Sequence, residues 1–154
     1  MDVLIALFLG LSSVIFAVTA VAKVITIIQG ESKLLTLPDP VFQMPTSWLM
    51  AGAAVIEIGL SIWITMCRSL TQLKLKVVGL VAILLSIYKC GILWLNAKPC
   101  SCLGALVNWS PWLEAHRNEV TWGLLIFLLF GSVLSQFVIN DDPRRSVCAK
   151  MLAL

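Results

Sequence analysis

The residues that decide the fold run from Val3 to Ala22, VLIALFLGLSSVIFAVTAVA, and contain no charged side chain. A membrane-spanning helix needs about 20 predominantly apolar residues, and the apolar pattern continues past Lys23 to Ile28. The stretch therefore predicts a spanning helix over residues 3–28. A cleavable signal peptide is the competing interpretation, because Ala20-Val21-Ala22 has the form of a cleavage site. The residues before the stretch carry no basic charge, and the stretch is long for a signal core, so we expect it to stay in the protein.

Three further apolar stretches follow along the chain. They predict helices over residues 47–67, 73–97 and 119–140, with a tail over 141–154. Prolines at 38, 40 and 45 exclude helix from the first connection, and Lys98-Pro99 ends the third stretch. The connections are loops over 29–46, 68–72 and 98–118. We expect one domain over residues 1–154, an all-α bundle of four transmembrane helices.

The composition agrees with a membrane protein. Of the 154 residues, 60% are hydrophobic and 12% are charged, whereas soluble proteins have roughly 45–50% and 25%. A chain with this composition is not expected to be a soluble globular protein, and it is too apolar to be disordered. A net charge of +3, with its basic residues dispersed, does not form a nucleic-acid-binding surface. The chain is also too short for a transporter built from two inverted repeats.

Basic residues predict the orientation, because the cytoplasmic flanks of membrane helices carry more Lys and Arg. Four crossings place both termini on one side, where six basic residues lie, against three on the opposite side. The six are Arg68, Lys74, Lys76, Arg144, Arg145 and Lys150, and the three are Lys33, Lys98 and Arg117. Both termini are therefore expected to be cytoplasmic. Tryptophans 48, 94, 109, 112 and 122 then form an outer aromatic belt.

The five cysteines divide between the two sides of the membrane. Cys100 and Cys102 belong to the outer loop, Cys67 and Cys148 lie at the cytoplasmic margin, and Cys90 lies in the third helix. Only the outer pair meets an oxidising compartment. A Cys-x-Cys disulfide closes a small strained ring, and strained exposed disulfides are the labile or catalytic kind. Three alternatives remain. The pair is a set of unreactive loop thiols, or it is a disulfide that only holds the end of the third helix, or it binds zinc together with His116. The zinc site would lack a fourth ligand.

Three charged residues interrupt the apolar helices: Lys23, Glu57 and Lys89. Each costs about 2.5–3.5 kcal/mol near the bilayer centre, so we expect the three side chains to face the bundle and to find partners. Lys23 has two interpretations, pairing within the bundle or snorkelling to the outer headgroups. Glu57 is too deep to snorkel, and it is either protonated or paired with Lys89 or Lys23. A Glu57–Lys89 pair that only holds helices together is favoured over a proton-handling role.

Several motifs together resemble a known family. They are Tyr88-Lys89-Cys90-Gly91, Pro99-Cys100-Ser101-Cys102-Leu103-Gly104, the Arg117-Asn118 pair that opens the fourth helix, the lysine near the end of the first helix, and Glu57-Ile58-Gly59. With four helices, this pattern resembles the DoxX-like superfamily, in particular its MauE (methylamine-utilisation) branch. Leu103 departs from the phenylalanine common there, and Pro99 from the glycine often found there.

The resemblance implies a thiol–disulfide role at the outer face of a bacterial inner membrane, where the Cys-x-Cys loop faces the periplasm. It is associated with maturation of disulfide-rich periplasmic enzymes or with quinone-linked oxidation. The first hypothesis is therefore a redox protein in which Cys100 and Cys102 exchange electrons with a thioredoxin-like partner, and through the bundle with quinone. Lys98 and Arg117 would stabilise the thiolate, and Glu57 or Lys89 would handle a proton. The second hypothesis is an accessory subunit that packs against a larger membrane complex.

Overall fold

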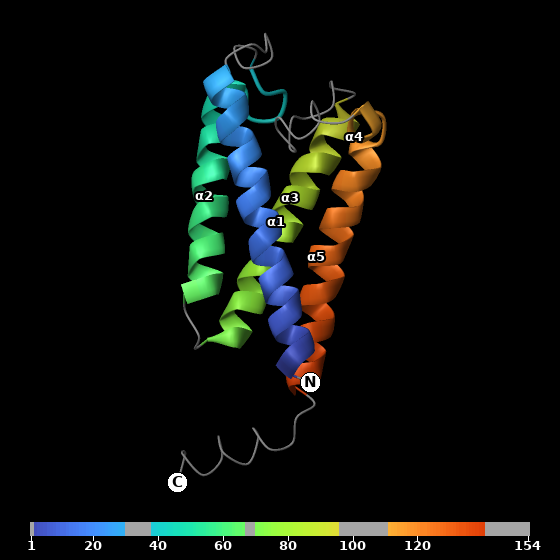
Figure 1. Ribbon diagram of the computed structural model, residues 1–154. Coiled ribbons are helices and arrows are strands. Elements are labelled where there is room, and N and C mark those ends of the chain that lie inside the picture. Colours follow the sequence, from blue (N-terminus) through green and yellow to red (C-terminus); the bar gives the residue numbers. More distant parts are fainter. Residues whose placement is uncertain (1, 30–37, 67–69, 96–110, 141–154) are drawn as a thin grey trace.

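The protein is described by a computed structural model over residues 2–29, 38–66, 70–95 and 111–140. The helices in these residues are α1 (Asp2–Gln29), α2 (Thr46–Met66), α3 (Thr71–Trp94), α4 (Pro111–Ala115) and α5 (Arg117–Asn140) (Figure 1). All except the short α4 are long and apolar enough to cross a membrane. The predicted all-α class and its four helices of spanning length are confirmed.

The predicted end of the third helix is wrong. The sequence predicts helix to residue 97, whereas α3 ends at Trp94. Leu95 is a turn residue whose N–H donates to the Gly91 carbonyl at 3.1 Å. The chain leaves the helix about one turn before Pro99, whose ring is incompatible with a helix interior.

The second correction concerns the predicted loop over 98–118, because its last part is helical. α4 begins at Pro111, whose fixed φ suits a first helical position. The His116 N–H donates to the Trp112 carbonyl, and the Val120 N–H to the His116 carbonyl. These bonds carry helical geometry across the α4–α5 junction, so that α5 starts at Arg117 rather than at residue 119.

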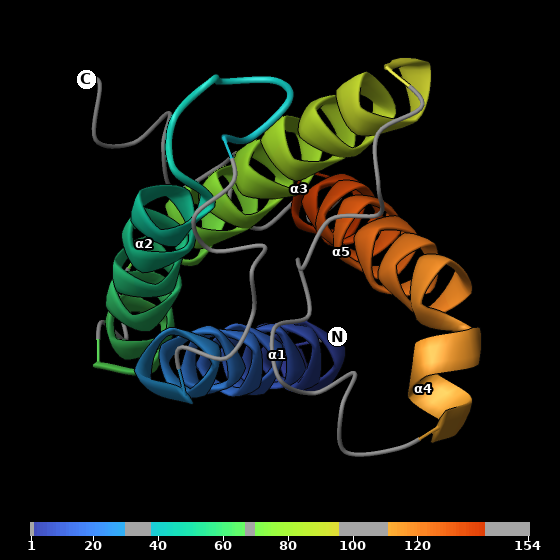
Figure 2. The same cartoon turned by 90° about the horizontal axis from the view of Figure 1, so that it is seen from above.

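The long helices are arranged as two antiparallel pairs. α1 packs along α2, and α3 packs along α5, and these are the most extensive helix contacts (Figures 1 and 2). Residues 38–45 and α4 lie at one end of the bundle, which we call the loop end. The start of α1 and the end of α5 lie at the other, which we call the terminal end.

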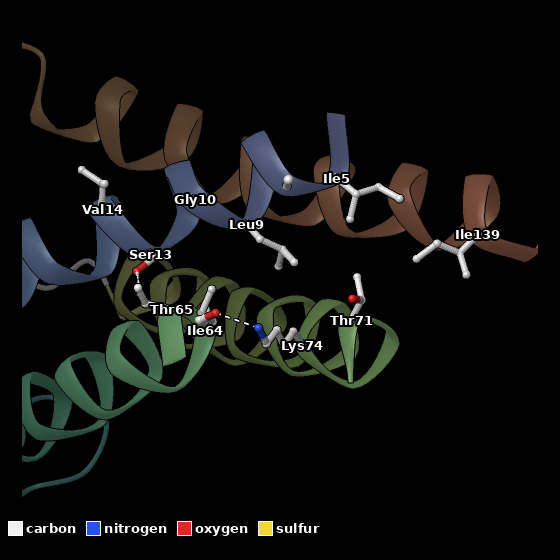
Figure 3. A pocket seen from close by; sticks show the side chains of 11 residues that line it. Ile5, Leu9, Gly10, Ser13, Val14, Ile64, Thr65, Thr71, Lys74 and Ile139 are labelled. Carbon is white, nitrogen blue, oxygen red and sulfur yellow. Dashed lines mark hydrogen bonds between the residues drawn. The ribbon is translucent and has the colours of Figure 1, made fainter. Parts of the chain in front are cut away.

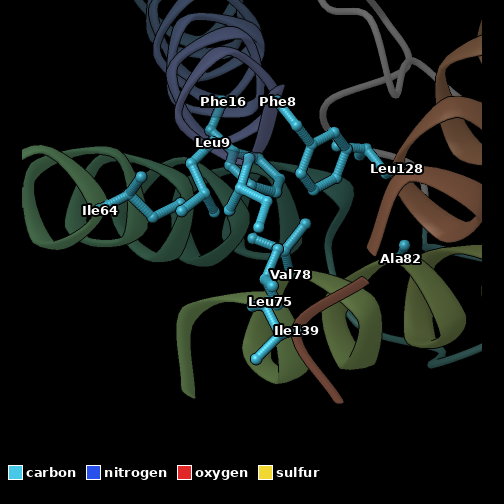
Figure 4. Packing of buried hydrophobic residues seen from close by; sticks show 10 residues of the cluster. Phe8, Leu9, Phe16, Ile64, Leu75, Val78, Ala82, Leu128 and Ile139 are labelled. Atoms are coloured by element: carbon cyan, nitrogen blue, oxygen red, sulfur yellow. The ribbon is translucent and has the colours of Figure 1, made fainter. Parts of the chain in front are cut away.

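The two helix pairs are joined by an apolar core in the terminal half. Phe8 of α1 packs against Phe127 of α5 with ring centroids 5.5 Å apart, and it points toward Leu128 (Figure 4). From α3, Leu75 and Val78 are completely buried in the same cluster. Helix pairs in a membrane associate through such close packing rather than through exclusion of water.

Outside this core, large apolar side chains are exposed along the long helices. Leu4, Val55, Leu84 and Phe130 are each more than half exposed. In a bilayer these side chains would contact lipid, and the mean hydropathy of the four helices suits that environment. α1 is an integral part of the bundle, because Ala20 and Ala22 of the considered cleavage site are buried in it.

Candidate functional site

The cysteine pair belongs to the segment that joins α3 to α4. Cys100, Cys102 and Lys98 lie outside the described residues, as do Cys67 and Cys148. The described chain reaches Leu95 before this segment and resumes at Pro111, and both positions are at the loop end. Cys90, on α3, is an exposed free thiol. The described residues next to this segment in the chain are those at the loop end of α3, in α4 and at the start of α5.

Lys23 and Glu57 form a buried ion pair between α1 and α2. The Lys23 Nζ lies 2.5 and 2.6 Å from the two carboxylate oxygens of Glu57, and each residue is only 6% exposed. Thr19, one turn before Lys23 on α1, donates its hydroxyl to Glu57 Oε2 at 3.1 Å. Small side chains beside the pair, Ala20 and Ala54, allow the helices to approach. The prediction that Glu57 has a lysine partner is confirmed.

The favoured Glu57–Lys89 pair is wrong, because Lys89 reaches a different helix. The Lys89 side chain is 3% exposed, and its Nζ donates to Asn118 Oδ1 of α5 at 2.9 Å. Within the described ranges, Lys23–Glu57 is the only pair at salt-bridge distance, so Lys89 has no carboxylate partner there. Snorkelling of Lys23 is also wrong, since its ammonium is buried against Glu57.

Arg117 adds a second positive charge beside Lys89. It is the first residue of α5 and is close enough to Lys89 for like-charge repulsion. Three candidates taken from the sequence, Lys89, Arg117 and Asn118, are therefore brought together where α3 and α5 meet at the loop end.

Sequence reasoning missed a second polar contact at the loop end. Asp39 is 3% exposed and accepts hydrogen bonds from the backbone N–H groups of Val41 and Phe42 at 2.9 and 3.0 Å. Tyr88 of α3 donates its hydroxyl to Asp39 Oδ2, and its ring stacks on Phe42 with centroids 5.7 Å apart. Asp39 thus fastens the turn over residues 38–45 to the helix that carries Lys89. The available signal was an aspartate between two prolines, which is typical of a turn.

His116 interacts with Trp112 at the junction of α4 and α5. Its Nδ1 lies 3.0 Å from the Trp112 carbonyl oxygen, and its ring stacks on Trp112 at 4.8 Å. Among the residues that the structure describes, no three His, Cys, Asp or Glu side chains gather as a metal site. The cysteines of the considered zinc site lie outside those residues.

A pocket of about 580 Å³ lies at the terminal end, between α1, α2, α3 and α5 (Figure 3). Of the α1 residues that line it, Ser13 and Val14 are the nearest to the loop end of the helix. Sixteen residues separate Ser13 from Gln29 at the end of α1, which at 1.5 Å per residue is about 24 Å. The pocket is therefore at the opposite end of the bundle from Leu95 and Pro111, the described residues on either side of the cysteine segment, and we derive no step through a quinone.

Comparison of the chain with protein-family models, with curated proteins and with solved structures finds no match.

Proposed function

We propose that the protein is a membrane thiol–disulfide exchange protein whose reactive groups are Cys100 and Cys102. The observation that supports this most is the meeting of Lys89 and Arg117 at the loop end, where neither has a carboxylate at salt-bridge distance among the described residues. Lys89 lies on α3, which precedes the cysteine segment, and Arg117 begins α5, which follows the segment after the short α4. Nearby cations stabilise a thiolate, which is the form of cysteine that attacks a disulfide.

The proposed exchange moves two electrons. A thiolate of the pair attacks a disulfide sulfur of a thioredoxin-like partner, and the other partner sulfur leaves as a thiolate. The second thiol of the pair loses its proton and attacks the mixed disulfide. The partner is then released as a dithiol, and Cys100 and Cys102 are joined as a disulfide. The reverse sequence oxidises the partner through the same intermediate.

The proposed setting follows the sequence. We place the cysteine segment in the periplasm and both termini in the cytoplasm of a bacterial inner membrane, in keeping with the basic residue distribution. Membership of the MauE branch of the DoxX-like superfamily is proposed from the Cys-x-Cys-Leu-Gly and Arg-Asn motifs. Exposed Trp48, Trp94 and Trp112 at the loop end suit a membrane–water interface.

In this proposal Glu57 is a structural residue. Its two carboxylate oxygens are occupied by Lys23 and Thr19, and the pair joins α1 to α2 deep in the bundle. A proton carrier would need to exchange its partner during each cycle. Lys89 is the polar residue nearer to the cysteine segment, and we assign it the electrostatic role.

The test is capture of a mixed disulfide. In Cys100→Ser or Cys102→Ser, one variant should accumulate a covalent complex with a periplasmic partner, because the resolving thiol is missing. Cys90→Ser is the matched control, since it removes an exposed thiol of α3 and should behave as the native protein. Native and variant membranes are alkylated with and without reductant and compared on non-reducing gels.

Two outcomes contradict the redox proposal. One is an outer pair that alkylates identically with and without reductant and never forms a mixed disulfide. The other is a double serine variant with full activity in the host pathway. Either result would assign the protein to the second class, an accessory subunit of a larger membrane complex.

A further inference from the structure

The pocket at the terminal end has apolar walls and an open side. Ile5 and Leu9 of α1, Ile64 of α2 and Ile139 of α5 are buried side chains that line it (Figure 3). Ala6 and Gly10 also line it and are exposed, so the pocket opens through the outer surface of α1. In a membrane this surface faces lipid, and an acyl chain could enter sideways.

One cation belongs to the same pocket. Lys74 of α3 is 5% exposed, and its Nζ donates one hydrogen bond, to the Ile64 carbonyl at 2.7 Å. No carboxylate of the described ranges lies within salt-bridge distance of it. The carbonyl end of α2 offsets part of the lysine charge. An anion at the pocket would offset the remainder, and the hydroxyls of Thr65 and Thr71 line the same space.

The dimensions fit one leaflet of a bilayer. On α1 the lining residues extend from Ile5 to Val14, which is about 13.5 Å at 1.5 Å per residue. Half of the hydrocarbon core of a bilayer is about 15 Å thick. Lys74 lies in the first turn of α3, near the headgroup level of that leaflet. The Lys74 ammonium and the apolar walls of the pocket are therefore arranged in the same order as the phosphate and the acyl chain of a lipid.

We propose that this pocket binds an anionic phospholipid, with one acyl chain against α1 and the headgroup phosphate beside Lys74. The site lies at the opposite end of the bundle from α4 and the end of α3, the described elements on either side of the cysteine segment. It does not depend on thiol chemistry, and loss of the lipid is expected to leave mixed-disulfide formation by the serine variants unchanged.

The first test measures headgroup selectivity. The full chain in neutral detergent is titrated with phosphatidylglycerol and, separately, with phosphatidylcholine of the same acyl chains, and bound lipid is counted by native mass spectrometry. Lys74→Gln should weaken phosphatidylglycerol binding about fivefold, as expected for one basic residue at a lipid headgroup, and should weaken phosphatidylcholine binding less, because the choline cation already balances the phosphate of that lipid. Lys76→Gln is the matched control, because Lys76 is exposed on the same helix.

The second test fills the pocket without disturbing the fold. A Cβ built at Gly10 meets no atom within 4 Å, so Gly10→Leu should place a side chain in the opening and abolish binding of both lipids. Gly52→Leu is the control, since Gly52 is equally uncrowded and lies on α2 away from the pocket. Helical content and melting temperature, measured for every variant, verify that each one is folded.

Three outcomes would overturn the lipid site. They are equal losses in Lys74→Gln and Lys76→Gln, retained binding in a folded Gly10→Leu variant, and displacement of phosphatidylglycerol by a neutral quinone with equal potency in native protein and Lys74→Gln. The last result would assign the pocket to an uncharged ligand. If Lys74→Gln fails to fold, Lys74→Arg replaces it and must retain selectivity for phosphatidylglycerol.

Discussion

Each helix pair buries one lysine in the loop half of the bundle, but the two lysines are compensated differently. Lys23, between α1 and α2, is neutralised by Glu57. Lys89, between α3 and α5, has the neutral side chain of Asn118 as its partner and Arg117 nearby. The first arrangement holds two helices together and leaves no net charge. The second leaves Lys89 and Arg117 without a carboxylate at salt-bridge distance in the described residues, and these are the cations that we propose act on the cysteine segment.

The largest effect is expected from breaking the compensated pair. Glu57→Gln leaves Lys23 buried without a counter-charge and should lower the free energy of unfolding by about 3–5 kcal/mol. Glu57→Lys should be worse, because it places two ammonium groups at one site. The measurement is denaturant or thermal unfolding of the purified protein in detergent.

The control for this prediction removes both charges together. In Lys23→Met with Glu57→Met, two apolar side chains replace the ion pair, and most of the lost stability should return. If Glu57→Gln is as stable as the native protein, the carboxyl does not compensate Lys23, and the contrast between the two helix pairs fails.

The contrast also shows how far sequence reasoning reaches. Charges in long apolar stretches identified Lys23, Glu57 and Lys89 as buried polar residues, since lipid exposure is costly for each of them. The partner of each charged residue could not be predicted from its depth in the membrane alone. Lys23 is six residues from the end of α1 and Lys89 is five residues from the end of α3. At 1.5 Å per residue these are about 9 and 7.5 Å, so the two lysines lie at similar depth and depth alone does not select the partner of Glu57.

The rotation of each helix about its own axis was predicted only in part. The pattern of small residues Ser13, Ala17 and Ala20 indicated the face that carries Lys23. On α3, Gly79, Ala82 and Ser86 recur at a comparable spacing before Lys89, and Gly79 packs against Ser132 of α5, so this signal was present in the sequence but was not used. Asn118 was selected only through the family resemblance, and its contact with Lys89 comes from the packing of α3 against α5. Asp39 was missed because a loop with three prolines has no periodicity to interpret.

A second, smaller effect is expected from changing the partner of Lys89. Asn118→Ala removes a hydrogen bond to a charged group and should destabilise the protein by about 1.5–3 kcal/mol. Asn118→Asp converts the uncompensated arrangement into an ion pair like that of Lys23. It should recover the stability lost in Asn118→Ala and should slow alkylation of the reduced cysteine pair, because it cancels the positive charge proposed to stabilise the thiolate.

Gln72→Glu is the matched control for the added negative charge. Gln72 is exposed on α3 at the terminal end, so this change should leave both stability and alkylation rate unaltered. An alkylation rate in Asn118→Asp equal to that of the native protein would show that the charge of Lys89 does not reach the cysteines.

The smallest effect is expected at the turn over residues 38–45, which contacts α3 at Tyr88 and Gly91. Tyr88→Phe removes the hydroxyl that donates to Asp39 but keeps the ring that stacks on Phe42. Asp39 still accepts hydrogen bonds from Val41 and Phe42, so the protein should lose only about 0.5–1.5 kcal/mol, the contribution of a typical hydrogen bond. The loss should be local, because the turn over 38–45 is fastened to α3 through this contact. Hydrogen exchange should therefore accelerate at the Gln43 and Asp39 amides, which bond within the turn, and stay unchanged in the terminal half.

Ser86→Ala, on the same helix, removes a hydroxyl that bonds only within α3 and should leave exchange in the turn unaltered. Equal acceleration in both variants would mean that Tyr88 acts through helix stability, and that the turn is held independently of the helix that carries Lys89.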